Sequence, residues 1–388
     1  MANIGIISEF NPFHTGHRFL INSVKGDGDT VICVMSGNFV QRGDVAILPK
    51  EERVRAALKN GADLIIELPC PYSTSAAQSF ATAGVHILNS LGITDCIAFG
   101  SECGDIAALE KIADILMSDE LNSKIPDRLK SGETFAKIRT DLLAEYGENL
   151  AEIIKSPNNT LATEYIIAAK KLGFKGDFKT VKRQGAEHDS KEICNTAVSA
   201  SLIRSRLLEG KSDEIEQFLP YIGDIANVAD IKRLETAILA SLRADNTRER
   251  YLALPDISEG IENRIVAAVK TAKSLDELFE AVKTKRYTLS RIRRIILCAF
   301  LGITKQAVDT LPPYVRILGF NEKGLSALKE ISNACRLPVI TKASDLDALP
   351  PAALSLWELE VKSGDLWALS LNNPQKCGSE YFYKIVKE

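Results

Sequence analysis

Short apolar runs alternate with amphipathic segments through the first hundred residues of the chain. The apolar runs cover residues 3–8, 29–37, 62–69 and 95–101. They lack the polar–apolar alternation of a half-exposed strand, so we expect strands that are buried on both faces. Helical patterns over 50–61 and 76–92 lie between them, and both end at a glycine. Strands that alternate with helices predict an α/β fold with a Rossmann-like, doubly wound parallel sheet.

The pattern changes in the second half of the chain. Residues 105–150 are mostly helical, and a helix over 158–173, a strand over 178–185 and a helix beginning near Ser199 complete the first unit. Beyond residue 212 the predicted elements are mainly helices, with short apolar runs between them. They cover 226–244, 261–284, 289–301, 314–320, 321 onward, 337–341 and 352–371. We therefore expect two domains: one over 1–211 that contains the parallel sheet, and a mainly helical C-terminal domain over 212–388.

Composition excludes several classes of protein. With 45% hydrophobic and 26% charged residues, the sequence is that of a globular protein. A net charge of −3 gives no global attraction to nucleic acid or membrane, so a polyanionic partner has to be met by a local patch. The eight cysteines contain no Cys-x-x-Cys pair and are expected to be reduced thiols. The beginning of the chain has no secretory pattern and no run approaches a membrane span, so we expect a cytoplasmic protein without a membrane partner.

Half of the four histidines occur in one turn, as His14 and His17 on either side of Gly16. The preceding Asn11-Pro12 predicts a turn, so a helix can begin close to Thr15. Two residues three apart then share one face. A helix N-terminus after a buried strand binds anions, and two imidazoles add hydrogen-bond donors. This combination favours phosphoryl or nucleotidyl transfer, in which positioning and charge stabilisation provide most of the catalysis.

Two other interpretations of these histidines remain open from the residues alone. They can simply cap the turn, or they can bind a metal, although no third ligand is evident because His86 and His188 are distant in sequence. His86 lies in an apolar helical pattern and is expected to be packed. His188, between Glu187 and Asp189, is a candidate general base or a surface-loop residue.

Two motifs connect the chain to a known superfamily. "NPFHTGH" resembles the His-x-Gly-His signature of the nucleotidyltransferase superfamily, and "VSASLIR" (198–204) resembles its second, Ser-rich Ile-Arg signature. Further stretches, "MSGNFVQRG", "NGADLIIELP", "FGSE", "SPNNTLATEY", "KRYTLSRIRR" and "RILGFNEKG", resemble the tRNA(Met) cytidine acetate ligase family over almost the whole chain. The resemblance implies a ligase that activates acetate with ATP as acetyl-adenylate, releasing pyrophosphate. The acetyl group then goes to N4 of the wobble cytidine, position 34, of elongator tRNA(Met), which forms N4-acetylcytidine and AMP.

The resemblance implies that the domain over 1–211 is a nucleotidyltransferase-like, ATP-binding domain and that the C-terminal domain over 212–388 binds tRNA. It also implies which residues act. His14, His17 and Arg204 are the implied catalytic residues, and Ser199 and Ser201 join Arg204 on the outer phosphates. The implied ATP-binding residues are Ile7, Ser8, Glu9, Phe10, Asn11, Pro12, Phe13, His14, Thr15, Gly16, His17, Arg18, Phe19, Gly100, Asn158, Arg183, Ser199 and Ser201. From the residues alone, Gly100 can also end a strand, Asn158 can cap a helix and Arg183 can be a surface charge.

The RNA surface is expected in a basic segment with one aromatic residue, Tyr287. Its candidate RNA-binding residues are Lys283, Lys285, Arg286, Arg291, Arg293 and Arg294. Asn38, Gln41 and Arg42, on the loop after the second strand, can read a cytosine edge or bind phosphate, whereas Lys50 and Arg53 are equally consistent with a solvated helix face.

Mg²⁺ is expected to bridge the phosphates of ATP, although the sequence offers no dedicated carboxylate cage for it and no protein metal ligands. Acetate and elongator tRNA(Met) are the expected partners, and DNA is not. Two other functions remain: an adenylyl- or cytidylyltransferase acting on a small molecule, and a non-catalytic RNA-binding protein.

Overall fold

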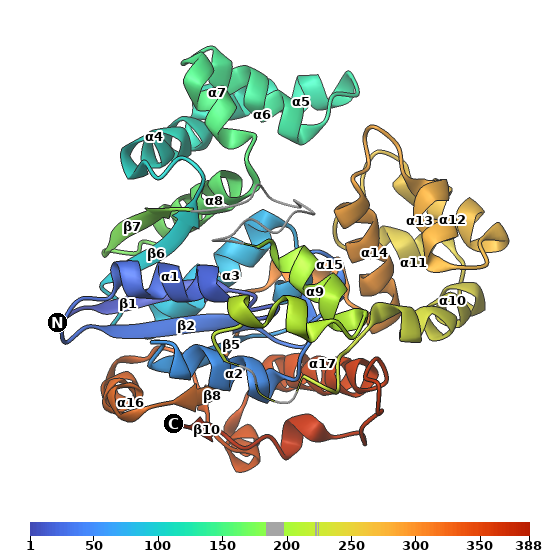
Figure 1. The fold of residues 1–388 in the computed structure, drawn as a ribbon. Helices are drawn as coiled ribbons and strands as arrows, with labels where there is room; N and C mark the ends of the chain where they lie inside the picture. Colours follow the sequence, from blue (N-terminus) through green and yellow to red (C-terminus); the bar gives the residue numbers. More distant parts are fainter. Residues whose placement is uncertain (184–197, 222, 224) are drawn as a thin grey trace.

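An eight-stranded mixed sheet forms the centre of the structure, a computed structural model that describes residues 1–183, 198–221, 223 and 225–388 (Figure 1). In spatial order the strands are β10 (Val386–Lys387), β8 (Val315–Phe320), β5 (Leu64–Leu68), β2 (Thr30–Ser36), β1 (Asn3–Ser8), β6 (Cys96–Ser101) and β7 (Asp177–Lys182), with β9 (Val339–Ile340) paired to β8. From β5 to β7 all neighbouring strands are parallel. The predicted doubly wound parallel arrangement is therefore confirmed in this part of the sheet.

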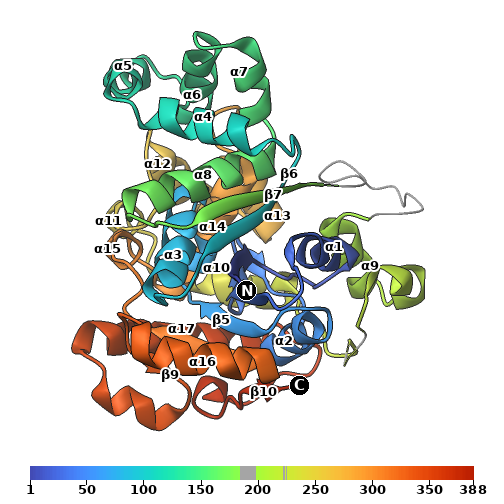
Figure 2. The same ribbon diagram turned by 90° about the vertical axis from the view of Figure 1, so that its left-hand side faces the viewer.

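Successive residues of the central strands face two different hydrophobic cores. Ile4 and Ile6 of β1 pack with the helices on one face, and Ile7 packs with those on the other. Because helices cover both faces of the sheet, the side chains that point to either face have to be apolar. This explains the continuous apolar runs in the sequence. The first face is covered by α1 (Thr15–Val24) and α2 (Lys50–Lys59), and the second by α3 (Ala77–Ser90), α8 (Pro157–Lys171) and α16 (Glu322–Ala334) (Figure 2).

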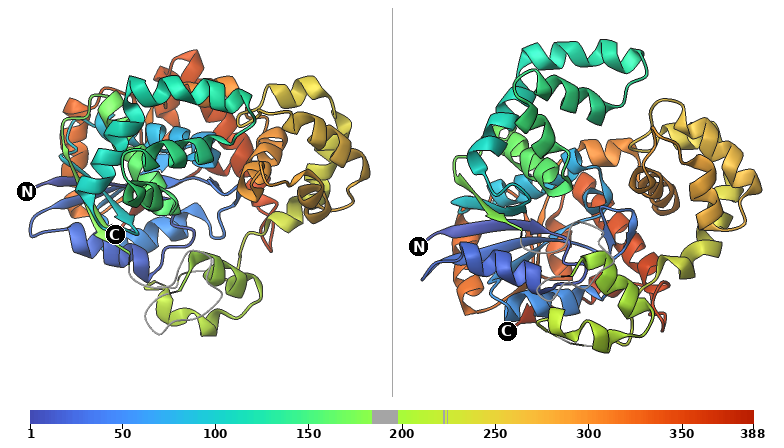
Figure 3. Two further views of the ribbon diagram at one scale, coloured as in Figure 1. Left: turned by 90° about the horizontal axis from the view of Figure 1, so that it is seen from above. Right: turned by 45° about the horizontal axis from the view of Figure 1, so that its top comes forward.

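Two helical units extend from the sheet on either side of its upper part in Figure 1 (see also Figure 3). The first unit packs on α8 and contains α4 (Ile106–Met117), α5 (Asp119–Lys130), α6 (Phe135–Ala144) and α7 (Glu148–Ile154). The second has its own hydrophobic core and contains α10 (Glu235–Ala244), α11 (Arg248–Leu252), α12 (Ile261–Thr271), α13 (Leu275–Val282), α14 (Leu289–Leu301) and α15 (Lys305–Asp309). Among the described helices, none is both long and apolar enough to cross a bilayer.

The remaining elements connect these parts. They are the ribbon strands β3 (Phe39–Val40) and β4 (Asp44–Val45), the helices α9 (Ala200–Leu208) and α17 (Pro351–Ala368), and six 3-10 turns: η1 (Tyr72–Thr74), η2 (Ser212–Glu214), η3 (Glu216–Phe218), η4 (Ile231–Leu234), η5 (Ala343–Ala348) and η6 (Ser379–Tyr381).

The last part of the chain differs from the predicted division at residue 212. Strand β8 pairs antiparallel with β5, and β10 pairs parallel with β8, so the C-terminal 75 or so residues complete the sheet of the N-terminal part. Only residues 231–309 form the expected helical unit. Pairing with β8 covers the edge of β5 that would otherwise expose a row of unpaired backbone groups.

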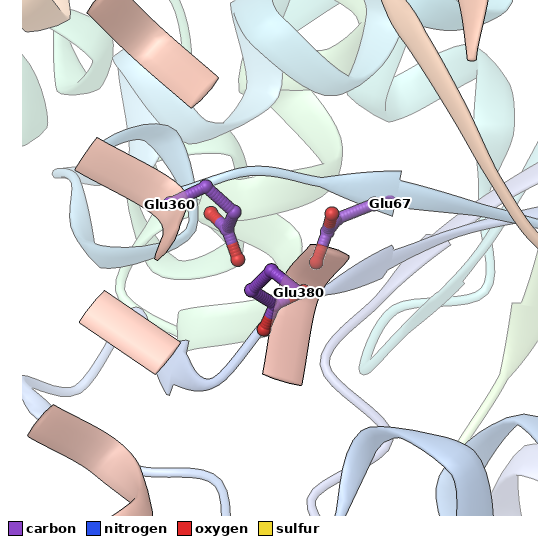
Figure 4. A group of neighbouring side chains, drawn as sticks. All are labelled: Glu67, Glu360 and Glu380. Carbon is purple, nitrogen blue, oxygen red and sulfur yellow. The ribbon is translucent and has the colours of Figure 1, made fainter. Parts of the chain in front are cut away.

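Five charged side chains are buried together where β5, β8, α2, α17 and η6 meet. They are Lys50, Glu67, Arg316, Glu360 and Glu380. Lys50 contacts all three carboxylates, and Arg316 lies 2.8 Å from Glu67 and 2.6 Å from Glu380. Figure 4 shows the three glutamates pointing toward one another. Their oxygens lie within 4.8 Å of one another, a spacing that suits a metal ion, but the two basic side chains already neutralise them.

The interpretation of Lys50 as a solvated residue is therefore wrong, and the same holds for Arg53, which is completely buried. Both face the sheet from the first two turns of α2, although the composition of this helix is strongly polar. Their partners come from distant parts of the chain, which a local pattern does not reveal.

Candidate active site at the first strand–helix corner

The turn after β1 places His14 at the N-cap of α1. The Nδ1 atom of His14 accepts a hydrogen bond from the backbone N–H of Gly16 at 3.0 Å. The Nδ1 atom of His17 accepts one from the backbone N–H of His14 at 3.2 Å. This reciprocal arrangement is a capping box built from two histidines. The predicted helix start near Thr15 is confirmed, and the cap fixes the orientation of both rings.

The same two hydrogen bonds define the protonation of the imidazoles. A nitrogen that accepts a hydrogen bond carries no proton, so each neutral ring has its proton on Nε2. Burial, with Arg183 and Arg204 nearby, lowers the pKa of His14 to about 3. Burial, His14 and Arg183 hold the pKa of His17 well below its usual range. At neutral pH the corner therefore presents two uncharged N–H donors beside the start of a helix.

Aromatic packing holds the His17 ring in place. Phe10 meets it edge to face at a centroid distance of 5.0 Å, and Phe13 lies 5.5 Å away. The two imidazoles are themselves only 4.0 Å apart. Phe10 has a φ of 44°, in the left-handed region that a bulky residue rarely adopts. The sharp turn at this position allows both Phe10 and Phe13 to be buried beneath the histidines.

The second signature motif reaches the same corner. Arg204 of α9 donates a hydrogen bond to the backbone carbonyl of Asn11 at 2.8 Å, across 193 residues of chain. Ser199 caps α9 by accepting from the backbone N–H of Leu202, and its hydroxyl lies 3.0 Å from that of Ser201. Both serines are thus at the start of a second helix, and Arg204, in the middle of that helix, contacts the histidine turn.

Gly100 and Arg183 lie next to each other at the ends of β6 and β7. The backbone N–H of Arg183 donates to the carbonyl of Ser101, which extends the pairing of the two strands. A Cβ atom added at Gly100 would lie 3.5 Å from Cγ of Arg183, in ordinary contact. Packing among the described residues therefore does not require a glycine here, and the missing side chain leaves room beside the strand. Because Arg183 also depresses both imidazole pKa values, it faces the histidine turn.

Asn158 is not the N-cap of its helix, since Ser156 holds that position and Asn158 lies in the first turn. Its backbone N–H and side-chain amide both donate to Oε1 of Glu102, at 3.2 and 2.7 Å. The backbone N–H of Asn159 donates to Oε2 of the same carboxylate at 2.8 Å. Glu102 therefore caps α8 and fastens the "SPNN" stretch to the end of β6, beside Gly100.

The predicted nucleotide segment from Ile7 to Phe19 does not lie on one surface. Ile7 is buried in the core against α3, whereas Gly16, Arg18 and Phe19 are exposed on the first turns of α1. Between them, the turn from Glu9 to His14 forms the floor of the corner. The fold thus brings together His14, His17, Arg183 and Arg204, while Ile7 supports them from within.

Sequence reasoning missed the role of Arg53. Its guanidinium donates to four backbone carbonyls, those of Glu9, Ser36, Gly37 and Leu48, at 2.6–3.2 Å. Burial lowers its pKa to about 10, so it stays charged at neutral pH. It joins the carboxyl ends of β1 and β2 and so holds the two loops that frame the corner. A lone arginine in a polar helix gives no local signal of this role.

Comparison with known proteins agrees with this geometry. The HIGH Nucleotidyl Transferase family matches residues 1–380. A Thermoanaerobacter protein named tRNA(Met) cytidine acetate ligase is 39% identical over 403 aligned residues, and an Acetivibrio thermocellus protein of the same name is 35% identical over 413. Both alignments cover 100% of each chain. The chain belongs to the tRNA(Met) cytidine acetate ligase family.

Solved structures of this family have the same fold. The crystal structure of apo TmcAL from Thermotoga maritima matches with a TM-score of 0.92, and that of TmcAL bound with alpha-thio ATP matches with 0.90. In both cases the sequence identity is 30% and the match covers 100% of both chains. The ATP analogue in the second structure agrees with an ATP-binding role for this fold.

In this tRNA(Met) cytidine acetate ligase family member, the basic segment divides into two groups. Arg291 bonds to Asp256 and Ser258 and lies 3.3 Å from Glu259, and Arg294 pairs with Asp256 at 2.7 Å. These two arginines hold the loop before α12. Lys283, Lys285 and Arg286 lie before the helix and are exposed. Arg293 is half-buried, 5.6 Å from the ring of Phe279.

The start of α14 also touches the loop after β2. Gly43 has a φ of +71°, and a Cβ atom there would lie 2.5 Å from the backbone nitrogen of Arg294. Only glycine permits this approach. The turn that carries Gln41 and Arg42 therefore contacts the basic helix directly, next to the histidine corner. Asn38 of the same loop is buried and donates to Glu380, so it supports the fold and does not read a base.

Two other histidines complete the account. His86 of α3 is packed, with Nε2 at 3.1 Å from the carbonyl of Pro312, as predicted. His188, with Glu187 and Asp189, lies outside the described residues. All seven described cysteines are free thiols, whereas Cys194 lies outside this part of the chain.

Proposed function

We propose that this chain is a tRNA(Met) cytidine acetate ligase. It activates acetate with ATP as acetyl-adenylate and transfers the acetyl group to N4 of the wobble cytidine, position 34, of elongator tRNA(Met). The relatives that carry this name align over their full length, which supports the substrate assignment. The observation that carries the proposal is the corner itself, where two neutral imidazoles, a helix start and Arg204 converge. The reaction takes place in the cytoplasm, where ATP and tRNA are both present.

In the first step a carboxylate oxygen of acetate attacks the α-phosphorus of ATP and pyrophosphate leaves. Negative charge grows on the phosphoryl oxygens as the attack proceeds. The Nε2–H groups of His14 and His17 donate hydrogen bonds to these oxygens, and the positive end of the α1 dipole lies beside them. Neutral donors suit this role, because the capping box fixes them in place before ATP binds.

The other nucleotide contacts follow from the positions of the second motif and of β6 and β7. Arg204, with Ser199 and Ser201, binds the outer phosphates and stabilises the leaving pyrophosphate. Gly100 lets the adenosine approach the backbone, and Arg183 and Asn158 lie on the same side. Residues Ser8 to Phe19 surround the triphosphate from the opposite side.

Mg²⁺ accompanies the phosphates of ATP in this proposal. Among the described residues, the one set of carboxylates spaced for a metal ion is Glu67, Glu360 and Glu380, which belongs to the buried charge cluster with Lys50 and Arg316 and not to the corner. Phosphate oxygens and water are the ligands that Mg²⁺ prefers in such a site. Its role is to neutralise phosphate charge.

The tRNA approaches along α14 and the loop before it. Lys283, Lys285 and Arg286 are the exposed cations, and Arg293 lies deeper, close to Asp44 and the corner. The anticodon base leaves its stack to reach the acetyl-adenylate, as enzymes that modify bases require. Gln41 and Arg42 lie on its path, since their turn touches α14.

A His17→Asn variant tests the role of the corner. Asparagine retains an acceptor for the backbone N–H of His14 but removes the Nε2–H donor. We expect acetate-dependent ATP–pyrophosphate exchange to fall by about 10²–10³-fold, the cost of removing one preorganised donor. The affinity for tRNA should be mostly unchanged. Undiminished exchange in this variant would reject the assigned role of the imidazole.

Labelled acetate, ATP and tRNA in one assay separate the three functions that the sequence left open. Acetyl groups on RNA only in the presence of ATP support the ligase. Nucleotidyl transfer to a small molecule without RNA acetylation favours the transferase. Binding of RNA with no turnover favours a non-catalytic protein.

A further inference from the structure

The second step of the proposed reaction needs a group that accepts a proton from the cytidine amine. The histidines are unsuited to this, because Nδ1 of each ring is occupied by a backbone N–H and both pKa values are far below neutrality. We therefore look for the acceptor among the other described side chains at the carboxyl edge of the sheet.

Most carboxylates near this edge are already engaged. Both oxygens of Glu102 accept hydrogen bonds from the first turn of α8. The three glutamates of the buried charge cluster are inaccessible and form ion pairs with Lys50 and Arg316. Glu9 and Asp44 are two described carboxylates outside these groups, and both lie near Arg204 of the corner.

Glu9 is held at the floor of the corner with one oxygen in use. It follows the last residue of β1, and its backbone carbonyl accepts a hydrogen bond from Arg53 at 3.2 Å. Its Oε1 atom accepts from the backbone N–H of Gln41 at 2.8 Å. No described group donates to Oε2. The side chain is half-buried, so this second oxygen is accessible while its position is fixed.

The charged groups around Glu9 come from four elements. Arg204 of α9, Arg42 of the β3–β4 turn and Arg53 of α2 favour the carboxylate, and Tyr165 of α8 lies close enough for Glu9 to raise the pKa of its phenol. Burial outweighs the three arginines and raises the pKa of Glu9 above its usual range. A raised pKa makes the ionised carboxylate a stronger base.

Asp44 is oriented differently. Its Oδ1 accepts the backbone N–H of the next residue, Val45, and its charged neighbours are Arg204, Arg293 and Asp230. Both carboxylates have Arg204 as a neighbour, but Glu9 directly follows β1 and begins the turn that carries His14, whereas Asp44 belongs to the turn that packs on α14.

We propose that Glu9 is the general base of acetyl transfer, an inference that rests on the proposed function. N4 of the cytidine forms a bond to the carbonyl carbon of acetyl-adenylate. The bond from that carbon to the bridging phosphate oxygen breaks, and AMP leaves with the electron pair. The proton from N4 passes to Oε2 of Glu9 and then to water.

A Glu9→Gln variant separates this role from a structural one. The glutamine amide oxygen still accepts the N–H of Gln41, so the loop remains anchored, but the side chain no longer accepts a proton. Because Glu9 belongs to the nucleotide-binding turn, acetate-dependent ATP–pyrophosphate exchange can change in this variant as well. We expect transfer from acetyl-adenylate to tRNA in single turnover to fall by about 10²–10⁴-fold, a loss much larger than that of exchange. The wild-type transfer rate should rise with pH through the pKa of Glu9, and this rise should disappear in the variant.

Asp44→Asn is the matched control, since it neutralises the other carboxylate of the same region and should transfer at close to the wild-type rate. Three results overturn the proposal: normal transfer by Glu9→Gln, an equal loss of exchange and transfer in that variant, or a transfer-specific loss in Asp44→Asn alone. If wild type shows no acetate-dependent exchange, the proposed function fails and the role of Glu9 falls with it. If wild type shows normal exchange and transfer and Glu9→Gln also transfers normally, the proposed function stands and only the role of Glu9 as general base is rejected.

Discussion

His14 and His17 both stabilise the backbone of the turn in which they lie. Each uses Nδ1 to satisfy an N–H group at the start of α1, so the ring proposed to meet the nucleotide also caps the helix. This double use fixes the tautomer without any carboxylate partner. It also keeps both rings neutral, because protonated imidazoles would lose the acceptor atom and face Arg183 and Arg204.

The neutral state of His14 predicts a pH-dependent stability in the absence of ATP. The pKa of His14 is about 3 in the folded protein and about 6.5 in the unfolded chain. On acidification the unfolded chain therefore binds a proton that the folded protein does not bind. At pH 5 this costs about 2 kcal/mol of unfolding free energy. Asparagine is a good N-cap, so His14→Asn retains the cap without the titration. Urea unfolding at pH 7 and pH 5 should show wild type losing about 2 kcal/mol more than the variant, and equal losses would contradict the assignment.

Among the helices, α14 shows how one element serves two purposes. Its arginines at positions 291 and 294 form ion pairs with the loop at 256–259, which fixes the helical unit, while the cations just before the helix stay exposed. The sequence predicts one continuous basic surface here. The structure shows that the cations of this segment differ in their contacts. Arg291 and Arg294 pair with carboxylates of the loop against which the helix packs, and the cations before the helix face solvent.

Neutralising the exposed cations should therefore change RNA binding, and neutralising the paired ones should change stability. We expect replacement of Lys283, Lys285 and Arg286 by glutamine to reduce the slope of log Kd against log salt by about 2, if each contacts one phosphate. Arg294→Gln is the control: it loses the pair with Asp256, so its Tm should drop while the salt slope stays close to wild type. Filter binding at several salt concentrations measures the slope. A triple variant with the wild-type slope would place the RNA surface elsewhere.

Across the whole molecule, the buried charge cluster joins residues from position 50 to position 380. With Lys50 and Arg316 positive, three carboxylates would leave one excess negative charge in the interior. Burial and the neighbouring Glu67 raise the pKa of Glu360 to about 8, whereas the pKa of Glu380 is held at about 2 by Lys50 and Arg316 against the opposing effect of burial. At neutral pH the cluster is therefore close to electrically balanced, with Glu360 protonated.

This balance predicts that the free energy of unfolding decreases as the pH rises from 5 to 8. Between the usual carboxyl pKa of 4.5 and about 8, the folded protein holds a proton on Glu360 that the unfolded chain has released, so stability falls as pH rises through this range. Glu360→Gln mimics the protonated form and lacks this titration. From pH 5 to pH 8, wild type should lose about 3 kcal/mol more unfolding free energy than Glu360→Gln, measured by urea denaturation. A parallel decline in both proteins would show that Glu360 is ionised throughout.

Removing a cation from the same cluster should also destabilise the fold. Arg316→Met leaves Glu67 and Glu380 without one of their two partners. We expect this variant to be less stable than wild type by about 3–5 kcal/mol at neutral pH, as for other buried ion pairs broken on one side.

The sequence by itself determined the local features of this protein. It specified the parallel strands, the helix over 289–301 and the start of α1, because apolar periodicity, caps and glycines act over a few residues. It also specified the two signature motifs, and hence the nucleotide corner and the family. Their meeting through Arg204 and Asn11 follows from the alternation of strands and helices, which places each loop at the same edge of the sheet.

Only the tertiary structure decided which distant residues meet. It placed β8 on the edge of β5, buried Lys50 and Arg53 in a polar helix, and directed Arg291 and Arg294 inward. It also left one oxygen of Glu9 open beside the histidines. In each case a buried polar group or a strand edge is satisfied by a partner tens to hundreds of residues away, and no local pattern encodes such a partner.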